Sequence, residues 1–325
     1  MSELYPLLMM PEFHERVWGT RDLAPIYTRI VGKDPIGEAW LTGDECKVAN
    51  GPLSGVTLRE LCKRFGRQLV GETAPAVDRF PLLVKFLFPK EKLSVQVHPD
   101  DEGAKAMGLP NGKTECWYVA RSIPGATVGL GLKTGTTREQ FAKAIEEKRA
   151  EELMNWIDVK TGDMIYVDAG TIHAIAPGSI LIEAQQNSDT TFRLYDYGRP
   201  RELHIEQGMR AMRATTAAGK VIRETRNGHD VLVASSCFVV ERYATTEPKS
   251  FNDEPGASAV QILVAVDGSG VVEAPGAQPV SFNRGESVII PASVPEFTVR
   301  PQWSIEFLRM QVPSEKLPPP KTTLS

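Results

Sequence analysis

One stretch, residues 93–100, restricts the possible fold more than any other. It reads Leu-Ser-Val-Gln-Val-His-Pro-Asp, so apolar and polar residues alternate. A period of two is typical of a β-strand with one buried and one polar face, and it places Gln96 and His98 on the same side, about 7 Å apart. Pro99 cannot donate to a strand ladder and should end the strand. The pattern therefore predicts a strand that presents an amide and an imidazole together.

The remaining segments predict further strands and only a few helices. Residues 80–88 (FPLLVKFLF) are apolar on both faces, as expected of a central strand, and residues 112–119 read as another strand. Helices are expected where capping residues precede a helical spacing of apolar side chains. They are predicted at 58–65 behind a Thr57–Glu60 capping box, after Asp100 or Asp101, from 136 to about 156, and at 204–212.

A polar segment without periodicity, residues 214–229, divides the chain. A length of 325 residues is sufficient for two domains. We predict one domain over residues 1–225, with strands and short helices, and a second over residues 226–325, built of strands alone. The last dozen residues are rich in proline and are expected to be loosely held.

Composition and charge argue against several classes of protein. The net charge is −4 and no long run of one sign occurs, so we expect neither nucleic-acid nor membrane-surface binding. No apolar stretch approaches the roughly 18 residues of a membrane span, and the N-terminus lacks the basic start of a secretory signal. The four cysteines are widely separated and form no CxxC motif, which favours a reduced, cytoplasmic protein.

A second informative segment ends at His173. Residues 162–173 (GDMIYVDAGTIH) contain a Gly turn, a five-residue strand, another Gly turn and a His, which resembles the second signature of the cupin superfamily. The usual proline of that turn is replaced by Asp168. A stretched form of the first cupin signature is matched by Gln96, His98 and Glu115. The resemblance implies a jelly-roll barrel in which these side chains point inward.

Two imidazoles, one carboxylate and one amide oxygen form a nitrogen and oxygen donor set. Such a set suits Zn²⁺ and would also accept Fe²⁺, Co²⁺ or Mn²⁺. Three strong ligands leave positions open for water or substrate, as catalytic sites require. Cys116 should point away from Glu115 on the same strand, and we interpret it as a core residue. The other histidines, His14, His204 and His229, lie in no such context.

Longer motifs resemble the type I phosphomannose isomerases. The matching segments are PLLVKFLFPKEKLSVQVHPDD, GKTECWYV, DAGTIHAI and IEAQQNSDTTFRLYDYGR, with GEAWLTGDE, NGPLSG and RELHIEQ in support. The resemblance spans residues 14–213 and is closest to the compact bacterial branch, which lacks a large helical insertion. It implies a mainly β fold: a cupin catalytic domain over residues 1–225, with a cupin-like β-barrel behind it.

The resemblance also implies an activity. The family interconverts mannose 6-phosphate and fructose 6-phosphate, so the expected partner is a small sugar phosphate. One zinc ion per chain is expected, with other divalent metals possible. Its implied ligands are Gln96, His98, Glu115 and His173.

Further active-site positions follow from the same resemblance. The catalytic arginine of the family falls on Arg193, and Lys113, Glu183 and Asp189 match other active-site residues. A guanidinium stays protonated, so Arg193 is expected to stabilise an enediolate rather than act as the base. The base is left open among Glu183, Asp189 and Lys113. Ser94 and Lys113, each on a face with metal ligands, are expected to contact the substrate together with Arg193.

The C-terminal part repeats the Gly, strand and turn pattern of residues 162–173 without its histidine. In residues 285–296 (GESVIIPASVPE), Glu296 occupies the place of the metal-binding His, and no His follows His229. We therefore expect a second cupin-like barrel without a metal site, which covers one side of the catalytic barrel.

Other functions are compatible with parts of this pattern. Another metal-cupin enzyme, such as an iron dioxygenase or an isomerase of unphosphorylated sugar, would use the same ligands. A non-catalytic sugar-binding cupin belongs to a different class, and the complete ligand set with Arg193 argues against it. The sequence predicts no oligomeric state.

Overall fold

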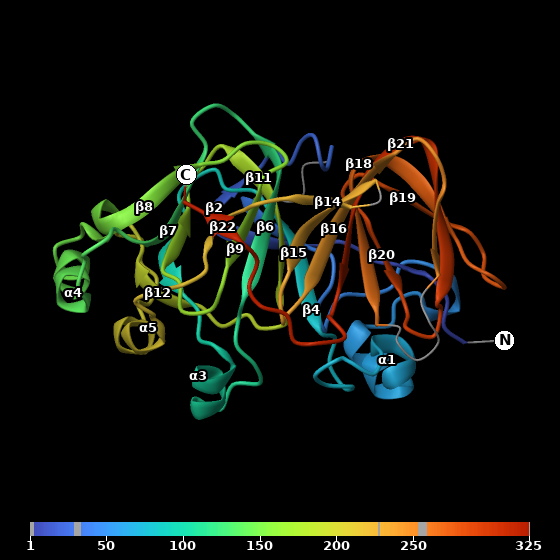
Figure 1. The fold of residues 1–325 in the computed structure, drawn as a ribbon, viewed down its shortest axis with the longest axis horizontal. Helices are drawn as coiled ribbons and strands as arrows, with labels where there is room; N and C mark the ends of the chain where they lie inside the picture. Colours follow the sequence, from blue (N-terminus) through green and yellow to red (C-terminus); the bar gives the residue numbers. More distant parts are fainter. Residues whose placement is uncertain (1–2, 29–33, 227, 253–258, 325) are drawn as a thin grey trace.

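The computed structural model describes residues 3–28, 34–226, 228–252 and 259–324. Within them the chain forms three antiparallel β-sheets of eight, five and nine strands, with short helices at the periphery (Figure 1). The eight- and five-stranded sheets together are called the first unit here, and the nine-stranded sheet the second unit. The predicted mainly β class is confirmed. No described helix has both the length and the apolar character that spanning a membrane would need.

The eight-stranded sheet forms one wall of the first unit. In spatial order its strands are β2 (Glu12–Thr20), β3 (Ile36–Trp40), β4 (Leu82–Leu87), β11 (Ser179–Gln186), β6 (Glu115–Ser122), β9 (Met164–Val167), β13 (Gly219–Val221) and β22 (Thr322–Thr323). All six residues of β4 are buried, which confirms the central strand predicted from its two apolar faces. The last strand, β22, shows that Thr322 and Thr323, in the segment predicted to be loosely held, are paired with β13.

The five-stranded sheet forms the opposite wall. Its strands in spatial order are β12 (Phe192–Tyr195), β5 (Val95–Val97), β10 (His173–Ile175), β7 (Thr127–Leu132) and β8 (Met154–Asp158). The strand predicted at residues 93–100 is thus shorter than its pattern, since only three residues carry strand geometry. Gln96 lies opposite His173 on one side and opposite Arg193 on the other. This register places three predicted site residues in one row.

An apolar core lies between these two walls. It combines side chains of the larger sheet with side chains of the smaller one: Leu87, Trp117, Val119 and Val167 from the first, and Val128, Leu130, Ile157 and Ile175 from the second. Since apolar burial drives this contact, the inner faces of both sheets are held close together. Polar side chains on the same inner faces are therefore brought within reach of one another.

The helices are short and lie outside the sheets. They are α1 (Leu58–Phe65), α2 (Arg67–Val70), α3 (Asp101–Ala106), α4 (Arg138–Glu146) and α5 (Ile205–Ala211), with 3-10 turns at Gly51–Leu53 and Ala150–Leu153. The predicted Thr57–Glu60 capping box is present, and Asp100 caps α3. Apolar side chains of α4 and α5 pack on the outer face of the five-stranded sheet.

The helix predicted to run from residue 136 to about 156 is wrong in its second half. Helix α4 ends at Glu146, and Lys148 has a left-handed backbone with φ of 59°. Beyond it, Met154–Asp158 pair with β7 as strand β8. The apolar residues there follow the two-residue period of a strand and not the period of a helix, because pairing with a neighbouring strand overrides the local helix propensity.

The second unit is a single sheet in which no helix occurs among the described residues. Its main path is β1 (Leu7–Leu8), β20 (Ser287–Ile290), β18 (Gln261–Glu273), β21 (Glu296–Gln311), β16 (Val239–Thr245), β15 (His229–Ala234) and β14 (Glu224–Arg226), with β17 (Lys249–Asn252) on β21 and β19 (Val280–Asn283) on β18.

The two ends of the chain are exchanged between the units. Strand β1 near the N-terminus pairs with β20 of the second unit, and β22 near the C-terminus pairs with β13 of the first. Figure 1 shows the N-terminus beside the orange second unit and the C-terminus beside the first. The chain passes from the first unit to the second between β13 and β14, and a domain boundary between residues 225 and 226 stays a prediction.

Candidate metal centre and active site

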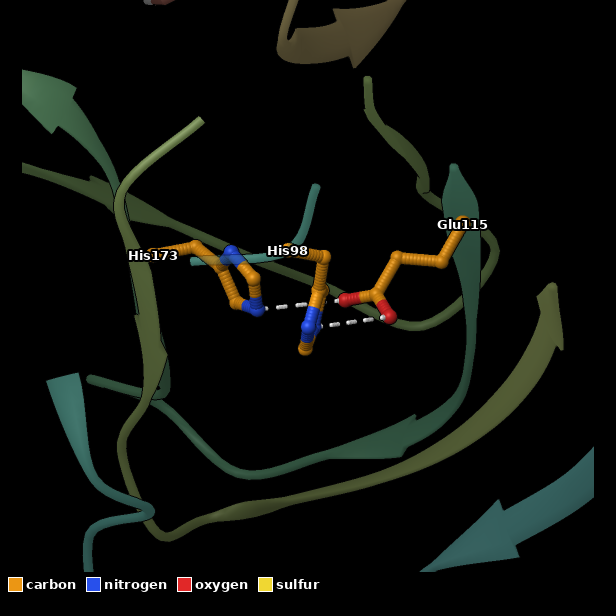
Figure 2. Close-up of side chains that lie close together, drawn as sticks. All are labelled: His98, Glu115 and His173. Carbon is orange, nitrogen blue, oxygen red and sulfur yellow. Dashed lines mark ion pairs between the residues drawn. The ribbon is translucent and has the colours of Figure 1, made fainter. Parts of the chain in front are cut away.

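Three ionisable side chains converge between the two walls of the first unit, one directly after β5, one on β6 and one on β10. Figure 2 shows His98, Glu115 and His173 pointing toward one another. The Nε2 atom of His98 lies 3.4 Å from one oxygen of Glu115, and Nε2 of His173 lies 3.3 Å from the other. The candidate ligand atoms of all three residues lie within 4.8 Å of one another, and all three residues are buried. The structure thus unites three of the four predicted ligands.

Both imidazoles are held with the same nitrogen toward the cluster. Nδ1 of His98 lies 2.9 Å from the Thr190 carbonyl oxygen, and Nδ1 of His173 lies 2.9 Å from that of Thr171. A carbonyl oxygen only accepts, so Nδ1 carries the proton and the Nε2 lone pair faces inward. Burial and the nearby Lys113 cation lower the pKa of His98 to about 3, and burial lowers the pKa of His173. Both rings are therefore neutral and able to bind a metal.

The carboxylate of Glu115 faces both imidazoles, one with each oxygen. Both of its oxygens are buried and accept no hydrogen bond, while Nζ of Lys113 lies 3.2 Å from one of them. Burial alone would raise the pKa of Glu115, but Lys113 and the two histidines hold the pKa well below its ordinary value. Ligands about 2.0–2.1 Å from a tetrahedral zinc lie about 3.3–3.4 Å apart, close to the separations found here. The donor set fits a divalent ion.

Gln96 reaches the same cluster with its amide. Its Nε2 atom lies 3.1 Å from Nε2 of His173, and its Oε1 atom accepts a hydrogen bond of 3.1 Å from the Ser94 hydroxyl. The amide nitrogen donates to the His173 lone pair, and a half-turn of the amide would present the oxygen instead. Gln96 as the fourth ligand stays a prediction.

A cavity of about 370 Å³ opens beside the cluster. Its lining includes all five residues predicted to act on or bind the substrate, and most of its polar side chains are charged. They are Ser94, Lys113, Glu183, Asp189 and Arg193, with Arg16, Glu38, Lys85, Gln96 and Arg201 beside them. A concave site with convergent charged groups suits a small polar ligand.

Across the eight-stranded sheet, a row of paired residues holds a buried ion pair. Lys85 of β4 lies opposite Glu183 of β11, which lies opposite Trp117 of β6. Nζ of Lys85 is 2.8 Å from one oxygen of Glu183, and the Trp117 indole donates to the other at 3.0 Å. Burial raises the pKa of Glu183 in spite of Lys85. Burial would lower the pKa of Lys85, but Glu183 and Glu38 raise it, so the lysine stays charged.

Sequence reasoning missed Lys85, Glu38 and Arg16 as site residues. Glu38 accepts hydrogen bonds from Arg16 (2.9 Å) and from the Trp40 indole (2.7 Å). Burial would raise the pKa of Glu38, but Lys85 and Arg16 hold the pKa at about 2. A signal for Lys85 was available, because it is the one charged residue in a run that is apolar on both faces. A lysine buried in a central strand needs a partner, which indicates a buried site.

Arg193 is the cavity cation without a carboxylate partner among the described residues. The other four are paired: Arg16 with Glu38, Lys85 with Glu183, Lys113 with Glu115, and Arg201 with Asp196. One guanidinium nitrogen of Arg193 donates to the Glu202 carbonyl at 2.7 Å, and its Nε is buried without a partner. Burial and the neighbouring Arg201 lower the pKa of Arg193. This uncompensated charge is available to an anionic ligand.

Asp189 and Cys116 occupy contrasting positions beside the cluster. Asp189 is exposed at the cavity and is followed by Thr190, whose carbonyl holds His98. Cys116 is buried in the core cluster that also contains Tyr118, on the other face of β6 from Glu115. The interpretation of Cys116 as a core residue is confirmed.

The sequence was compared with protein families and with known proteins. The family model described as phosphomannose isomerase type I, catalytic domain, matches residues 7–120. Mannose-6-phosphate isomerase ManA of Bacillus subtilis is 33% identical over 308 residues, which cover 90% of this chain and 95% of the relative. The mannose-6-phosphate isomerase of Streptococcus mutans is 32% identical over 302 residues, 89% of this chain and 93% of the relative.

A solved structure gives the same result for the fold. The crystal structure of the mannose 6-phosphate isomerase from Bacillus subtilis superposes with a TM-score of 0.84 at 31% identity, over 94% of this chain and 99% of the other. The predicted class, a cupin catalytic part followed by a second cupin-like β part, is thereby confirmed. Because relatives of this identity match nearly the whole chain, the chain belongs to the type I phosphomannose isomerases, a family of enzymes.

Proposed function

We propose that the chain interconverts mannose 6-phosphate and fructose 6-phosphate with one divalent ion, bound by Gln96, His98, Glu115 and His173. The observation that carries this proposal is the buried His98–Glu115–His173 cluster, whose two Nε2 lone pairs face an unbonded carboxylate beside a charged cavity. The activity named for the relatives supports the same substrate.

The donor set favours zinc among the divalent metals. Imidazole nitrogen with carboxylate and amide oxygen is a common zinc environment, although Fe²⁺, Co²⁺ and Mn²⁺ accept it too. When bound, the ion would supply positive charge that polarises the sugar carbonyl. The chain itself supplies the orientation of both imidazoles through the Thr190 and Thr171 carbonyls.

Aldose–ketose interconversion moves a proton between C1 and C2 of the sugar through a cis-enediol. Negative charge develops on the sugar oxygens during this step, and a fixed cation in a buried site stabilises it. Arg193 is suited to the task because its Nε is buried without a hydrogen-bond partner and, among the described residues, no carboxylate forms an ion pair with its guanidinium. Ser94 and Lys113 line the same cavity and would bind sugar hydroxyls or the phosphate.

Glu183 is our preferred base among the three candidates. Lys113 forms an ion pair with Glu115 at 3.2 Å, and we therefore assign it to substrate contact rather than to proton transfer. Glu183 lines the cavity and has a raised pKa, which suits a group that must take and return a proton near neutral pH. Asp189 is exposed and remains the alternative.

A coupled assay with mannose 6-phosphate tests the function. We expect turnover that a strong chelator abolishes and that added Zn²⁺ restores. Turnover on unphosphorylated mannose at the same rate would show that the phosphate is not recognised, and oxygen uptake would favour an iron dioxygenase. Metal-dependent binding of mannose 6-phosphate without turnover would favour a sugar-binding cupin.

The exchange of substrate hydrogen with solvent deuterium separates the candidate bases. Glu183→Gln should abolish incorporation of deuterium at C2, whereas Asp189→Asn should leave it measurable. The reverse result would assign the proton transfer to Asp189.

A cytoplasmic location is also proposed. All four cysteines are free, and three of them are buried. Free cysteines without disulfides are typical of a reducing compartment.

A further inference from the structure

A single turn between β9 and β10, residues 168–171, binds the segments that carry all three clustered ligands. Its backbone makes three contacts: the Gly170 N–H donates to the His98 carbonyl (2.9 Å), the Ala169 N–H donates to the hydroxyl of Thr114 beside Glu115 (3.3 Å), and the Thr171 carbonyl accepts from Nδ1 of His173 (2.9 Å). A displacement of this turn would therefore change the position of every ligand at once.

The side chain of Asp168 holds the turn in shape. One carboxylate oxygen accepts a hydrogen bond of 2.9 Å from the buried Thr171 hydroxyl. The other accepts a hydrogen bond of 3.0 Å from the Ala217 N–H, in the segment that leads to the second unit. A proline, usual at this position of the cupin signature, has no side-chain acceptor, so both bonds depend on the aspartate of this chain.

The turn is also packed tightly against that segment. The Arg213 N–H donates to the Gly170 carbonyl at 2.9 Å. Gly170 has φ of 88°, and a Cβ there would lie 2.6 Å from the Arg213 side chain. The guanidinium of Arg213 in turn pairs with Asp100, two residues after His98. These contacts hold the turn at Gly170, so the loss of Asp168 should act mainly at Thr171, whose carbonyl orients the His173 ring.

We infer that Asp168 is a positioning residue of the metal centre, which acts through the 168–171 turn and touches neither metal nor substrate. This inference rests on the proposed function, since it assumes that the cluster binds a divalent ion. Its carboxylate keeps the Thr171 carbonyl, and with it the His173 ring, in the orientation that presents Nε2. Loss of such outer hydrogen bonds typically weakens metal binding about 10–100-fold.

The test is the zinc affinity of the metal-stripped full chain, measured by competition with a chromophoric chelator. Asp168→Ala should weaken zinc binding about 10–100-fold relative to wild type. Asp168→Asn keeps one acceptor oxygen but cannot accept from both donors, so its affinity should lie between the two. An Asp168→Ala chain that binds zinc as tightly as wild type would overturn the inference.

Asp163 provides a matched control at the other end of the same strand. Its carboxylate also accepts a backbone hydrogen bond, from the Lys160 N–H at 3.0 Å, and it pairs with Lys220 at 2.9 Å. Asp163→Ala should lower the midpoint of urea unfolding as Asp168→Ala does, yet leave zinc affinity at the wild-type level.

Equal loss of zinc affinity in both variants would show a general structural effect and contradict the positioning role. A wild-type chain without zinc affinity would instead refute the proposed metal centre, and the inference with it. A wild-type chain that binds zinc but does not isomerise the sugar would refute the proposed reaction and leave the role of Asp168 standing.

Discussion

Two segments in different units, residues 162–173 and 285–296, share one backbone pattern and end in different side chains. Gly162 and Gly285 begin them with φ of 89° and 87°. In each, the next residue accepts a backbone hydrogen bond through its carboxylate, at 3.0 Å for Asp163 and 2.8 Å for Glu286. A buried four-residue strand follows in both cases. The first residue of the next strand is the buried His173 in the first unit, but an exposed glutamate in the second.

The interiors of the two units differ in the same way. Among the described residues, every buried Asp, Glu, Lys, Arg or His side chain lies on the strands of the first unit or on the loops next to them: Glu38, Asp44, Lys85, His98, Lys113, Glu115, His173, Glu183 and Asp196. The main core of the second unit is instead rich in aromatic residues: Tyr243, Phe251, Phe282, Phe297 and Phe307. Burial of charge opposes folding unless the charges are paired. The second unit therefore has a core that favours stability, whereas the first unit keeps buried charges of the kind that the proposed reaction requires.

The largest difference between the units should appear when each of these two segments loses its final side chain. His173→Ala removes an imidazole ligand and should release the metal and reduce turnover to background. Glu296→Ala removes an exposed side chain and should change neither. Metal content per chain and the coupled isomerase assay measure both effects. Metal retention by His173→Ala at the wild-type level would contradict the proposed ligand set.

A variant of Arg193 should separate the loss of turnover from the loss of metal within the first unit. Arg193→Ala should reduce kcat by about 10²–10³-fold, the typical effect of removing a group that stabilises developing charge. The metal content should stay at the wild-type level, because Arg193 is not a proposed ligand. Metal loss equal to that of His173→Ala would show that the arginine supports the cluster instead.

Variants of the Lys85–Glu183 pair test whether these buried charges contribute to function rather than to stability. Lys85→Met alone should lower the free energy of unfolding by about 3–5 kcal/mol, because Glu183 is left buried and unpaired. The double variant Lys85→Met/Glu183→Leu should regain most of that stability and remain inactive. Urea unfolding and the isomerase assay distinguish the two quantities. An active double variant would remove Glu183 from the mechanism.

The smallest expected effect is a pH dependence of stability in the metal-free chain. Since the pKa of His98 is about 3 in the folded state and 6.5 ordinarily, its contribution is present above pH 6.5 and is lost as the pH falls toward 3. Between pH 7 and pH 5 the loss should be about 2 kcal/mol. The difference in unfolding free energy between wild type and His98→Asn isolates this contribution from the other buried groups. A difference that does not change with pH would contradict it.

Local pattern was sufficient for much of the fold. The Thr57–Glu60 and Asp100 caps and the central strand β4 lie where short sequence patterns indicated. His98, Glu115 and His173 lie together, as the resemblance to the cupin signatures implied. Capping and alternation depend on side chains within a few residues of one another, so the sequence itself carries them. The helix that begins at α4 was predicted to end too late, because residues 154–158 pair with β7 as a strand instead of continuing the helix.

Only the tertiary structure decided which distant residues meet. Gln96 and His173 are 77 residues apart and become neighbours through the register of β5 and β10. The partners of Lys85 were likewise invisible, because they lie on β3 and β11, strands that the sequence could not align. The exchange of β1 and β22 between the units is a third example. Strand register is set by the simultaneous burial of apolar faces along the whole chain, and no local window of sequence contains that information.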